Sequence, residues 1–289
     1  MIDTFVVRLV MRVRKQSYTL LRVKGRKQRF IHGAEDFVIF SPSVNKETTQ
    51  ITPRRVAGSV SKERLPLVSL IIGVLAFVGI MTAIPMAFFY APPEVVQGPV
   101  QRIFYFHVPI AWIGMLAFVV MAIASIGYLW KRDERLDWAA RASAEIGTVF
   151  ITLTLITGSI WGRTTWGTWW SWDPKLTASL VLWFMYIGYL MIRSYMGRTP
   201  ASANAGAVLA IIGVFDVPII YEAVNLWRGL HPGAQVGVAG ALPPEAIITL
   251  MVSLAGFTLL YTFLMLQVYQ FQKLQTLAQR LRATVEYDM

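Results

Sequence analysis

Six stretches of the chain are almost free of charged residues and have close to the length needed to cross a lipid bilayer. They are residues 66–89, 104–130, 146–161, 176–192, 201–221 and 246–271. A spanning helix needs about 20 predominantly apolar residues, within a range of about 17 to 25. The third stretch is short, and we expect it to extend back through Glu145 toward Trp138. Because the strict alternation of a membrane β-barrel is missing, the sequence predicts an all-α integral membrane protein, a bundle of six transmembrane helices.

The positive charge is unevenly distributed, and this predicts the orientation of the bundle. The net charge is +11, and residues 1–65 contribute +9 of it. Arginine and lysine concentrate at alternate ends of the six stretches, as expected for cytoplasmic segments. Both termini are therefore predicted to be cytoplasmic. The short external loops would span about 90–104, 162–174 and 222–245.

Three parts of the chain are predicted to differ in character. Residues 1–65 form a basic extension to which we assign no function, and it reads as a disordered tail or as a start codon placed too early. Residues 66–271 form the membrane domain. Residues 272–289 continue it as a cytoplasmic amphipathic tail, with Leu274, Leu277 and Leu281 at helical spacing. A basic segment can bind nucleic acid, but beside a membrane domain we expect contact with anionic lipids instead.

The absence of cysteine and of a phosphate-binding loop excludes several classes of chemistry. No cysteine occurs in the chain, which excludes disulfides, thiolate metal sites and covalent haem attachment through a C-x-x-C-H motif. No G-x-x-x-x-G-K-[ST] sequence is present. Any step driven by ATP must therefore be supplied by a partner.

Tryptophan is concentrated in one predicted external loop. Five of the ten tryptophans fall between Trp161 and Trp172. An aromatic belt at the membrane interface is one explanation, and we assign Trp161 to such a belt. The remaining four crowd a loop in which Gly162 and Gly167 permit tight turns. They favour a platform for a large planar apolar ligand, formed by Trp166, Trp169, Trp170 and Trp172.

The end of this loop carries a helix-start signal. Asp173 followed by Pro174 is typical of an N-cap and the first helical position. Asp173 could serve as this helix cap or could contact a ligand, and the sequence does not decide between the two roles. Lys175 lies where the helix dipole disfavours a cation, so it either reaches lipid headgroups or pairs with a ligand carboxylate.

Two of the three histidines lie on the same predicted face as the tryptophan loop. His107 opens the second stretch, and His231 lies in the third external loop. A single histidine at a helix end is usually structural, but two beside an aromatic shelf fit a haem with one imidazole on each face of the iron. A zinc site would need three or four ligands. Arg102 and Arg228 are candidate partners for the haem propionates, with Arg102 favoured.

Two acidic residues fall in the fifth stretch. Asp216 and Glu222 are functional candidates because carboxylates are costly inside a membrane. Asp216 with Pro218 is equally explained by a kinked helix. A proton relay would need a longer series of such groups.

The segment from Trp166 to Thr177, which reads WGTWWSWDPKLT, resembles the tryptophan-rich signature of the haem-handling proteins of cytochrome c biogenesis. The passages around His107 (FHVPIAW) and His231 (LHPG) resemble the haem exporter protein C family in particular, as does the number of spans. The resemblance covers about residues 66–245. Related haem lyases and synthases usually have glutamate after the lysine, where this chain has Leu176.

The resemblance implies a haem-delivery subunit of the bacterial inner (plasma) membrane rather than an enzyme. Such a protein holds haem b (iron protoporphyrin IX) externally between two axial histidines, here His107 and His231, against the tryptophan loop. It loads the haem onto a periplasmic haem chaperone, protein E. Its other partners are the ABC transporter subunits A and B and the small protein D.

Three other readings compete with this one. A stand-alone cytochrome c synthase or haem lyase subunit is the nearest, although six spans and Leu176 argue against it. A quinone-binding or proton-moving subunit would also use aromatic shelves and histidines. A purely structural scaffold for transporter assembly would tolerate the loss of both histidines.

Overall fold

The computed structural model describes residues 65–227, 229–233, 238 and 241–287. All of these belong to the second of two compact units, which covers Val60–Met289. The predicted extension at residues 1–65 thus lies almost entirely outside the described residues, as does Arg228. The described helices are α3 (Leu65–Pro85), the π-helical turn Met86–Tyr90, the 3₁₀ turn Pro99–Ile103, α4 (Phe104–Lys131), α5 (Glu134–Trp166), α6 (Pro174–Tyr195), α7 (Pro200–Gly213), α8 (Asp216–Leu226) and α9 (Pro244–Tyr287).

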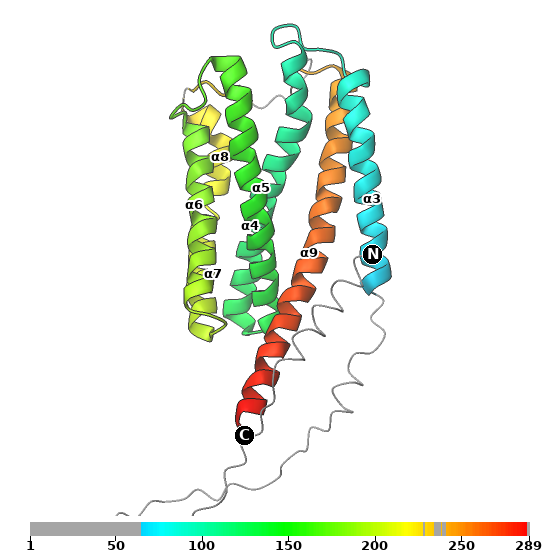
Figure 1. Cartoon of the computed structure of the whole chain (residues 1–289). Coiled ribbons are helices and arrows are strands. Elements are labelled where there is room, and N and C mark those ends of the chain that lie inside the picture. The colour runs from blue at the N-terminus through cyan, green and yellow to red at the C-terminus, as the bar shows by residue number, and fades with distance from the viewer. Residues whose placement is uncertain (1–64, 228, 234–237, 239–240, 288–289) are drawn as a thin grey trace, which may run out of the picture. The chain divides into compact units, whose positions relative to one another are not determined.

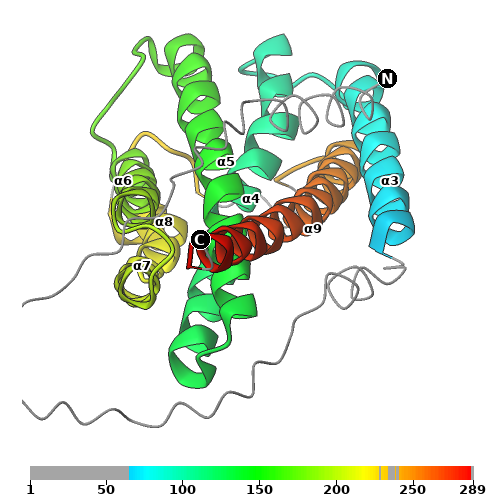
Figure 2. The ribbon, with the colours of Figure 1, turned by 60° about the horizontal axis from the view of Figure 1, so that its bottom comes forward.

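The prediction of six membrane-spanning helices is confirmed. Six helical segments are long and apolar enough to cross a bilayer, with α7 and α8 together making the fifth. Within this unit α4 and α5 pack against each other at the centre, α3 pairs with α9 on one flank, and α6 packs with α7 and α8 on the other (Figures 1 and 2). Helices are favoured in lipid because every backbone N–H and C=O is paired within the segment.

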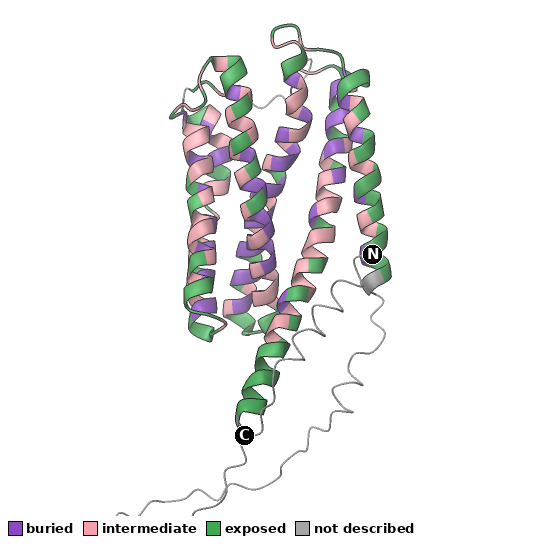
Figure 3. Ribbon diagram, in the orientation of Figure 1, coloured by how far each residue is buried: buried purple, intermediate pink, exposed green. Residues whose placement is uncertain are grey.

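Helix α3 has the most lipid-like surface of the bundle. Most of its large side chains are exposed (Figure 3). The face toward α9 is lined with small residues, and Ala76, Ala83 and Ala87 are at most 1% exposed. A Cβ added to Gly79 would lie 3.0 Å from the Cα of Gly256 in α9. This close approach of two backbones is how helices associate where lipid removes the hydrophobic driving force.

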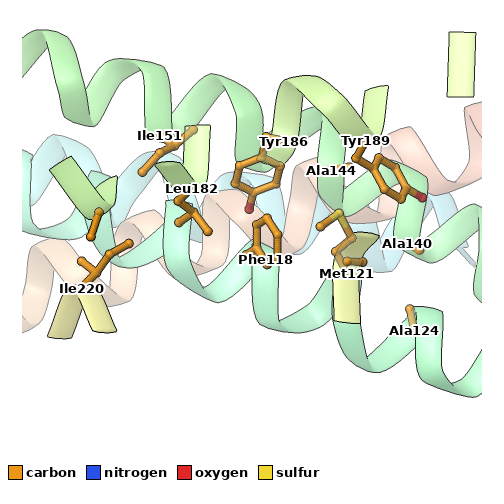
Figure 4. Packing of buried hydrophobic residues seen from close by; sticks show 12 residues of the cluster. Phe118, Met121, Ala124, Ala140, Ala144, Ile151, Leu182, Tyr186, Tyr189 and Ile220 are labelled. Carbon is orange, nitrogen blue, oxygen red and sulfur yellow. The ribbon is translucent and has the colours of Figure 1, made fainter. Parts of the chain in front are cut away.

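The core between α4, α5 and α6 contains buried aromatic rings, among them Phe118, Tyr186 and Tyr189 (Figure 4). Phe118 and Tyr186 meet edge to face with their ring centroids 4.8 Å apart. The hydroxyl of Tyr186 donates to the carbonyl oxygen of Gly114 at 2.8 Å, so this buried polar group is satisfied. The position that a Cβ of Gly147 would take is filled by the Tyr186 hydroxyl.

An ion pair joins α5 and α6 at the end of the bundle opposite the tryptophan loop. Arg193, in the last turn of α6, donates to Asp137, in the first turn of α5, at 2.6 Å. A cation at a helix C-terminus and an acid at a helix N-terminus both complement the helix dipoles. The pair therefore fixes the two antiparallel helices at this end.

The structure differs from the sequence prediction at the C-terminal end of α5 and in the fifth span. α5 extends back through Glu145 and Trp138, as expected, and begins still earlier, at Glu134. It also continues through Trp166, so Gly162 is helical rather than part of a turn. The tryptophan loop is therefore shorter than 162–174, and its turn is made by Gly167 with a φ of 76°. The fifth span is interrupted at residues 214–215, between α7 and α8. In a continuous helix the N–H of residue 218 would donate to the carbonyl oxygen of Val214, but Pro218 has no N–H. α9 runs from Pro244 to Tyr287, so residues 272–287 continue the helix of the sixth span without a break.

Gly147→Ala is expected to lower the melting temperature of the protein in detergent. The new methyl group would occupy the position of the Tyr186 hydroxyl, and overpacking of this kind costs about 1–3 kcal/mol. The control is Gly188→Ala, whose Cβ would meet only Leu209 at 3.4 Å and which should gain helix propensity. Equal melting temperatures for the two glycine variants would contradict this account of the core.

Candidate functional site

One cavity gathers the features that the sequence analysis singled out. It is lined by His107 of α4, Trp166 of α5, Trp170 of the loop, Lys175 of α6, and His231 beyond α8. About 900 Å³ of empty space lies between the lining atoms, counting the part open to solvent. Apolar side chains such as Met115, Ile151 and Leu176 make up much of the remaining wall. A mostly apolar wall with a few polar groups is typical of a small-molecule site.

His107 is held by the helix opposite its own. It is 9% exposed, and its Nδ1 lies 2.8 Å from Oγ1 of Thr157 in α5. The Thr157 hydroxyl donates to the carbonyl oxygen of Leu153 at 2.7 Å. Its oxygen therefore accepts the Nδ1 proton, and the lone pair of His107 is left on Nε2. A hydrogen bond of this kind fixes both the tautomer and the ring orientation of a histidine ligand.

The backbone of α5 leaves room for this histidine. A Cβ on Gly158 would lie 3.1 Å from Cε1 of His107, closer than most such contacts. Trp161 covers the ring edge to face at a centroid distance of 5.6 Å. Its indole N–H donates to Gln97 at 2.8 Å. The assignment of Trp161 to an interfacial belt misses this role, although its spacing of four from Thr157 on a helix puts both on one face.

His231 lies outside any helix and packs against the last residue of α5. Trp166 meets its ring edge to face at a centroid distance of 5.9 Å. Nδ1 donates to the carbonyl oxygen of Pro232 at 3.3 Å, which again leaves Nε2 free. Burial lowers the pKa of His231, and the nearby charge of Lys175 lowers it further. The imidazole is therefore neutral at pH 7, the form that binds metals.

Asp173 connects the two halves of the site. It is 6% exposed and caps α6 as predicted, with Oδ1 accepting the backbone N–H of Lys175 at 3.0 Å. Its Oδ2 accepts the backbone N–H groups of Leu230 at 2.6 Å and His231 at 3.3 Å. A Cβ on Gly229 would overlap this carboxylate, so only glycine permits the approach. Asp173 is thus a structural tie between the tryptophan loop and the His231 segment.

Four of the predicted site residues do not line the cavity: Asp173, which binds the backbone beside it, and Trp169, Trp172 and Arg102. Trp169 and Trp172 are 61% and 75% exposed, and Trp172 packs edge to face on Trp170. The guanidinium of Arg102 lies 5.5 Å from the ring centroid of Phe88. The two indoles form an exposed aromatic surface on the tryptophan loop, while Arg102 makes a cation–π contact at the end of α3.

The side chains that line this cavity indicate which kind of ligand it can bind. Among residues 65–227, 229–233, 238 and 241–287, no three His, Cys, Asp or Glu side chains group in a way that would hold a metal ion. Two neutral imidazoles suit an iron whose other four positions are filled by a macrocycle. The aromatic walls offer edge and face contacts to such a ring, and Lys175 supplies a cation for its acidic substituents.

Comparison with known proteins identifies close relatives. The family model described as "Heme exporter protein C" matches residues 51–284. Proteins named "Heme exporter protein C" from Bradyrhizobium diazoefficiens and Haemophilus influenzae are 42% and 36% identical to this chain, over 60% and 79% of it and 67% and 91% of their own lengths. A Marchantia polymorpha mitochondrial protein named for cytochrome c biosynthesis is 36% identical over 55% of this chain and 67% of its own length.

Asp173→Ala is expected to release the segment that carries His231. The amide protons of Leu230 and His231 should exchange with solvent faster by roughly tenfold, because each loses its acceptor and a hydrogen bond to a charged group contributes about 1.5–3 kcal/mol. The measurement is amide hydrogen exchange by mass spectrometry.

The matched control is Asp133→Ala, which removes the N-cap carboxylate of α5 at a similar cost in helix stability. Asp133 has no contact with residues 229–233, so exchange there should stay at the wild-type rate. The same acceleration in both variants would mean that capping, not the tie, is the role of Asp173.

Proposed function

The chain belongs to the haem exporter protein C family, and from this premise we propose that it binds haem in the cavity between His107 and His231 and presents it for cytochrome c maturation. The observation that carries the proposal is the convergence of two histidines with free Nε2 atoms on one cavity walled by tryptophan. Haem is the cargo of the protein, and no covalent bond to it is expected because the chain has no cysteine.

Each part of the cavity has a role in this proposal. The two imidazoles bind the iron axially, and Thr157 keeps Nε2 of His107 available for it. Trp166 and Trp170 contact the porphyrin. Lys175 pairs with a propionate, which explains a cation at a helix start, where the dipole alone would disfavour it. These groups would hold the haem by coordination and contact and leave its edges accessible.

The remaining features suit delivery to a partner. Trp169 and Trp172 are exposed beside the cavity, and exposed aromatic side chains are favoured at protein interfaces. We propose that a periplasmic haem chaperone docks there, with ABC transporter subunits and a small membrane protein completing the system. The predicted orientation, with both termini cytoplasmic in the bacterial plasma membrane, puts the cavity on the external side.

His107→Ala and His231→Ala are each expected to remove one axial ligand. Protein purified in detergent should lose the absorption spectrum of low-spin, six-coordinate haem and retain less haem than the wild type. Adding free imidazole should restore the low-spin spectrum if a ligand has been lost. Wild-type spectra in both single variants would refute axial ligation, and a variant that cannot be rescued by imidazole would point to a packing role.

Lys175→Gln is expected to weaken haem retention by roughly tenfold to a hundredfold, because a charge-assisted hydrogen bond contributes about 1.5–3 kcal/mol. Retention is measured as the haem left after repeated washing in detergent. Lys175→Arg should keep most of it.

Arg102→Gln tests the other predicted propionate partner. Arg102 contacts Phe88 rather than lining the cavity, so we expect its loss to have the smaller effect. Wild-type retention in Lys175→Gln would favour headgroup contact for Lys175 and contradict the propionate assignment.

A further inference from the structure

A second cavity lies at the other end of the same helices and is lined by arginine. Its walls come from α5 (Arg141), α6 (Arg193), the connector after α6 (Arg198) and α9 (Arg282), together with Gln275 and Gln279. About 830 Å³ of empty space lies between the lining atoms, including the part open to solvent. It shares no lining residue with the cavity of the two histidines.

The acidic groups near this cavity compensate only part of its charge. Asp137 pairs with Arg193 at 2.6 Å. Glu145 pairs with Arg141 at 3.3 Å and also accepts the amide of Gln272 at 2.7 Å. Within the part of the chain that the structure describes, neither of the other two arginines of the cavity has a carboxylate partner. Four cations are thus set against two acids.

Arg198 is half-buried and Arg193 is buried, and both line the cavity. Arg198 donates to side-chain oxygens of α9, those of Gln272, Gln275 and Thr276. Arg193 is 2% exposed, and its Nε and Nη1 have no hydrogen-bond partner among the described residues. Buried donors without a partner cost free energy, and an anion bordering Arg193 would supply acceptors for these two nitrogens.

The arginines also repel one another. Burial lowers the pKa of Arg198 below its ordinary value, and the positive charges of Arg141 and Arg193 lower it further. Like charges held together in this way are stabilised by a bound anion. Guanidinium groups match phosphate especially well, because two parallel N–H groups can donate to two phosphate oxygens.

The position of the cavity along the helices indicates whether its phosphate would come from a lipid headgroup or from a soluble molecule. Trp130 and Tyr195, at the same ends of α4 and α6, are 82% and 85% exposed. Exposed tryptophan and tyrosine at helix ends mark the level of the lipid headgroups. The part of α9 that lines the cavity, residues 275–282, follows the end of the apolar part of that helix.

We propose that this arginine-lined cavity binds the phosphate group of an anionic phospholipid headgroup. Arg198 and Arg282 supply the donors that no carboxylate neutralises, and Arg193 and Arg141 supply the surrounding positive field. A bound headgroup would join α5, α6 and α9, three helices that meet at this end. The site is independent of haem, so it stands or falls separately from the proposed function.

The test uses the full chain in detergent micelles at fixed ionic strength. The melting temperature is followed by tryptophan fluorescence while phosphatidylglycerol is titrated into the micelles, with phosphatidylcholine as the neutral lipid. A separate arm replaces the lipid with inorganic phosphate. The variants are Arg198→Gln and Arg282→Gln. The control is Arg280→Gln, which removes the same charge two residues away on α9 but does not line the cavity.

Phosphatidylglycerol is expected to raise the melting temperature of the wild type and of Arg280→Gln. Each cavity variant should need about fivefold more of it for the same shift, the usual contribution of one basic residue near an anionic membrane. Arg282 is exposed, so its variant should fold normally. An equal shift from inorganic phosphate, with the same pattern of variants, would support the phosphate site and name a soluble source.

Three outcomes would overturn the proposal. The first is no shift from either ligand, and the second is a wild-type response in both cavity variants. The third is an equal loss in Arg280→Gln and Arg282→Gln, which would mean that general surface charge attracts the lipid.

Discussion

Lipid offers the protein backbone no hydrogen-bond partner, and this constraint decides where each remaining feature of the molecule can lie. The spans must be helical, so non-helical backbone is confined to their ends and to places covered by neighbouring helices. Residues 167–173 and the segment containing His231 lie beyond helix ends. The break after α7 is packed against α4 and α6. The two cavities lie at opposite ends of the bundle. Each is lined in part by residues near helix ends and in the connectors between helices, where the backbone need not be helical.

Asp173 shows how one side chain can serve the helix and the site together. Capping α6 requires only one of its oxygens, and the other oxygen binds the backbone on which His231 lies. The start of α6, the end of the tryptophan loop and the second histidine are thereby held to a single carboxylate. The two explanations considered for Asp173, cap or functional residue, are not alternatives, because the cap is what positions the functional segment.

The fold was largely predictable from the sequence, and the site only in part. Apolar length and charge placement identify the spans, and Asp173 with Pro174 marks the start of α6. His107 and His231 could also be selected from the sequence, because both are predicted to lie on the same face as the tryptophan loop. Thr157 and Gly158 could not be found in this way, because their importance arises from the packing of α5 against α4, which no local pattern encodes. Trp166 was expected in a loop but belongs to a helix, since a helix can continue past Gly162 when a ring packs over it.

The backbone that carries His107 is held far more rigidly than the backbone that carries His231. His107 projects from a helix in the centre of the bundle, and displacing it would require α4 to move against α5. His231 belongs to a short segment outside the helices, tied by backbone hydrogen bonds to Asp173. Segments of this kind open locally at a small fraction of the free energy of global unfolding. A haem held between these two imidazoles, as proposed, would have one ligand on a rigid helix and one on a segment that opens locally. Local opening would then release the haem while the membrane core stays folded.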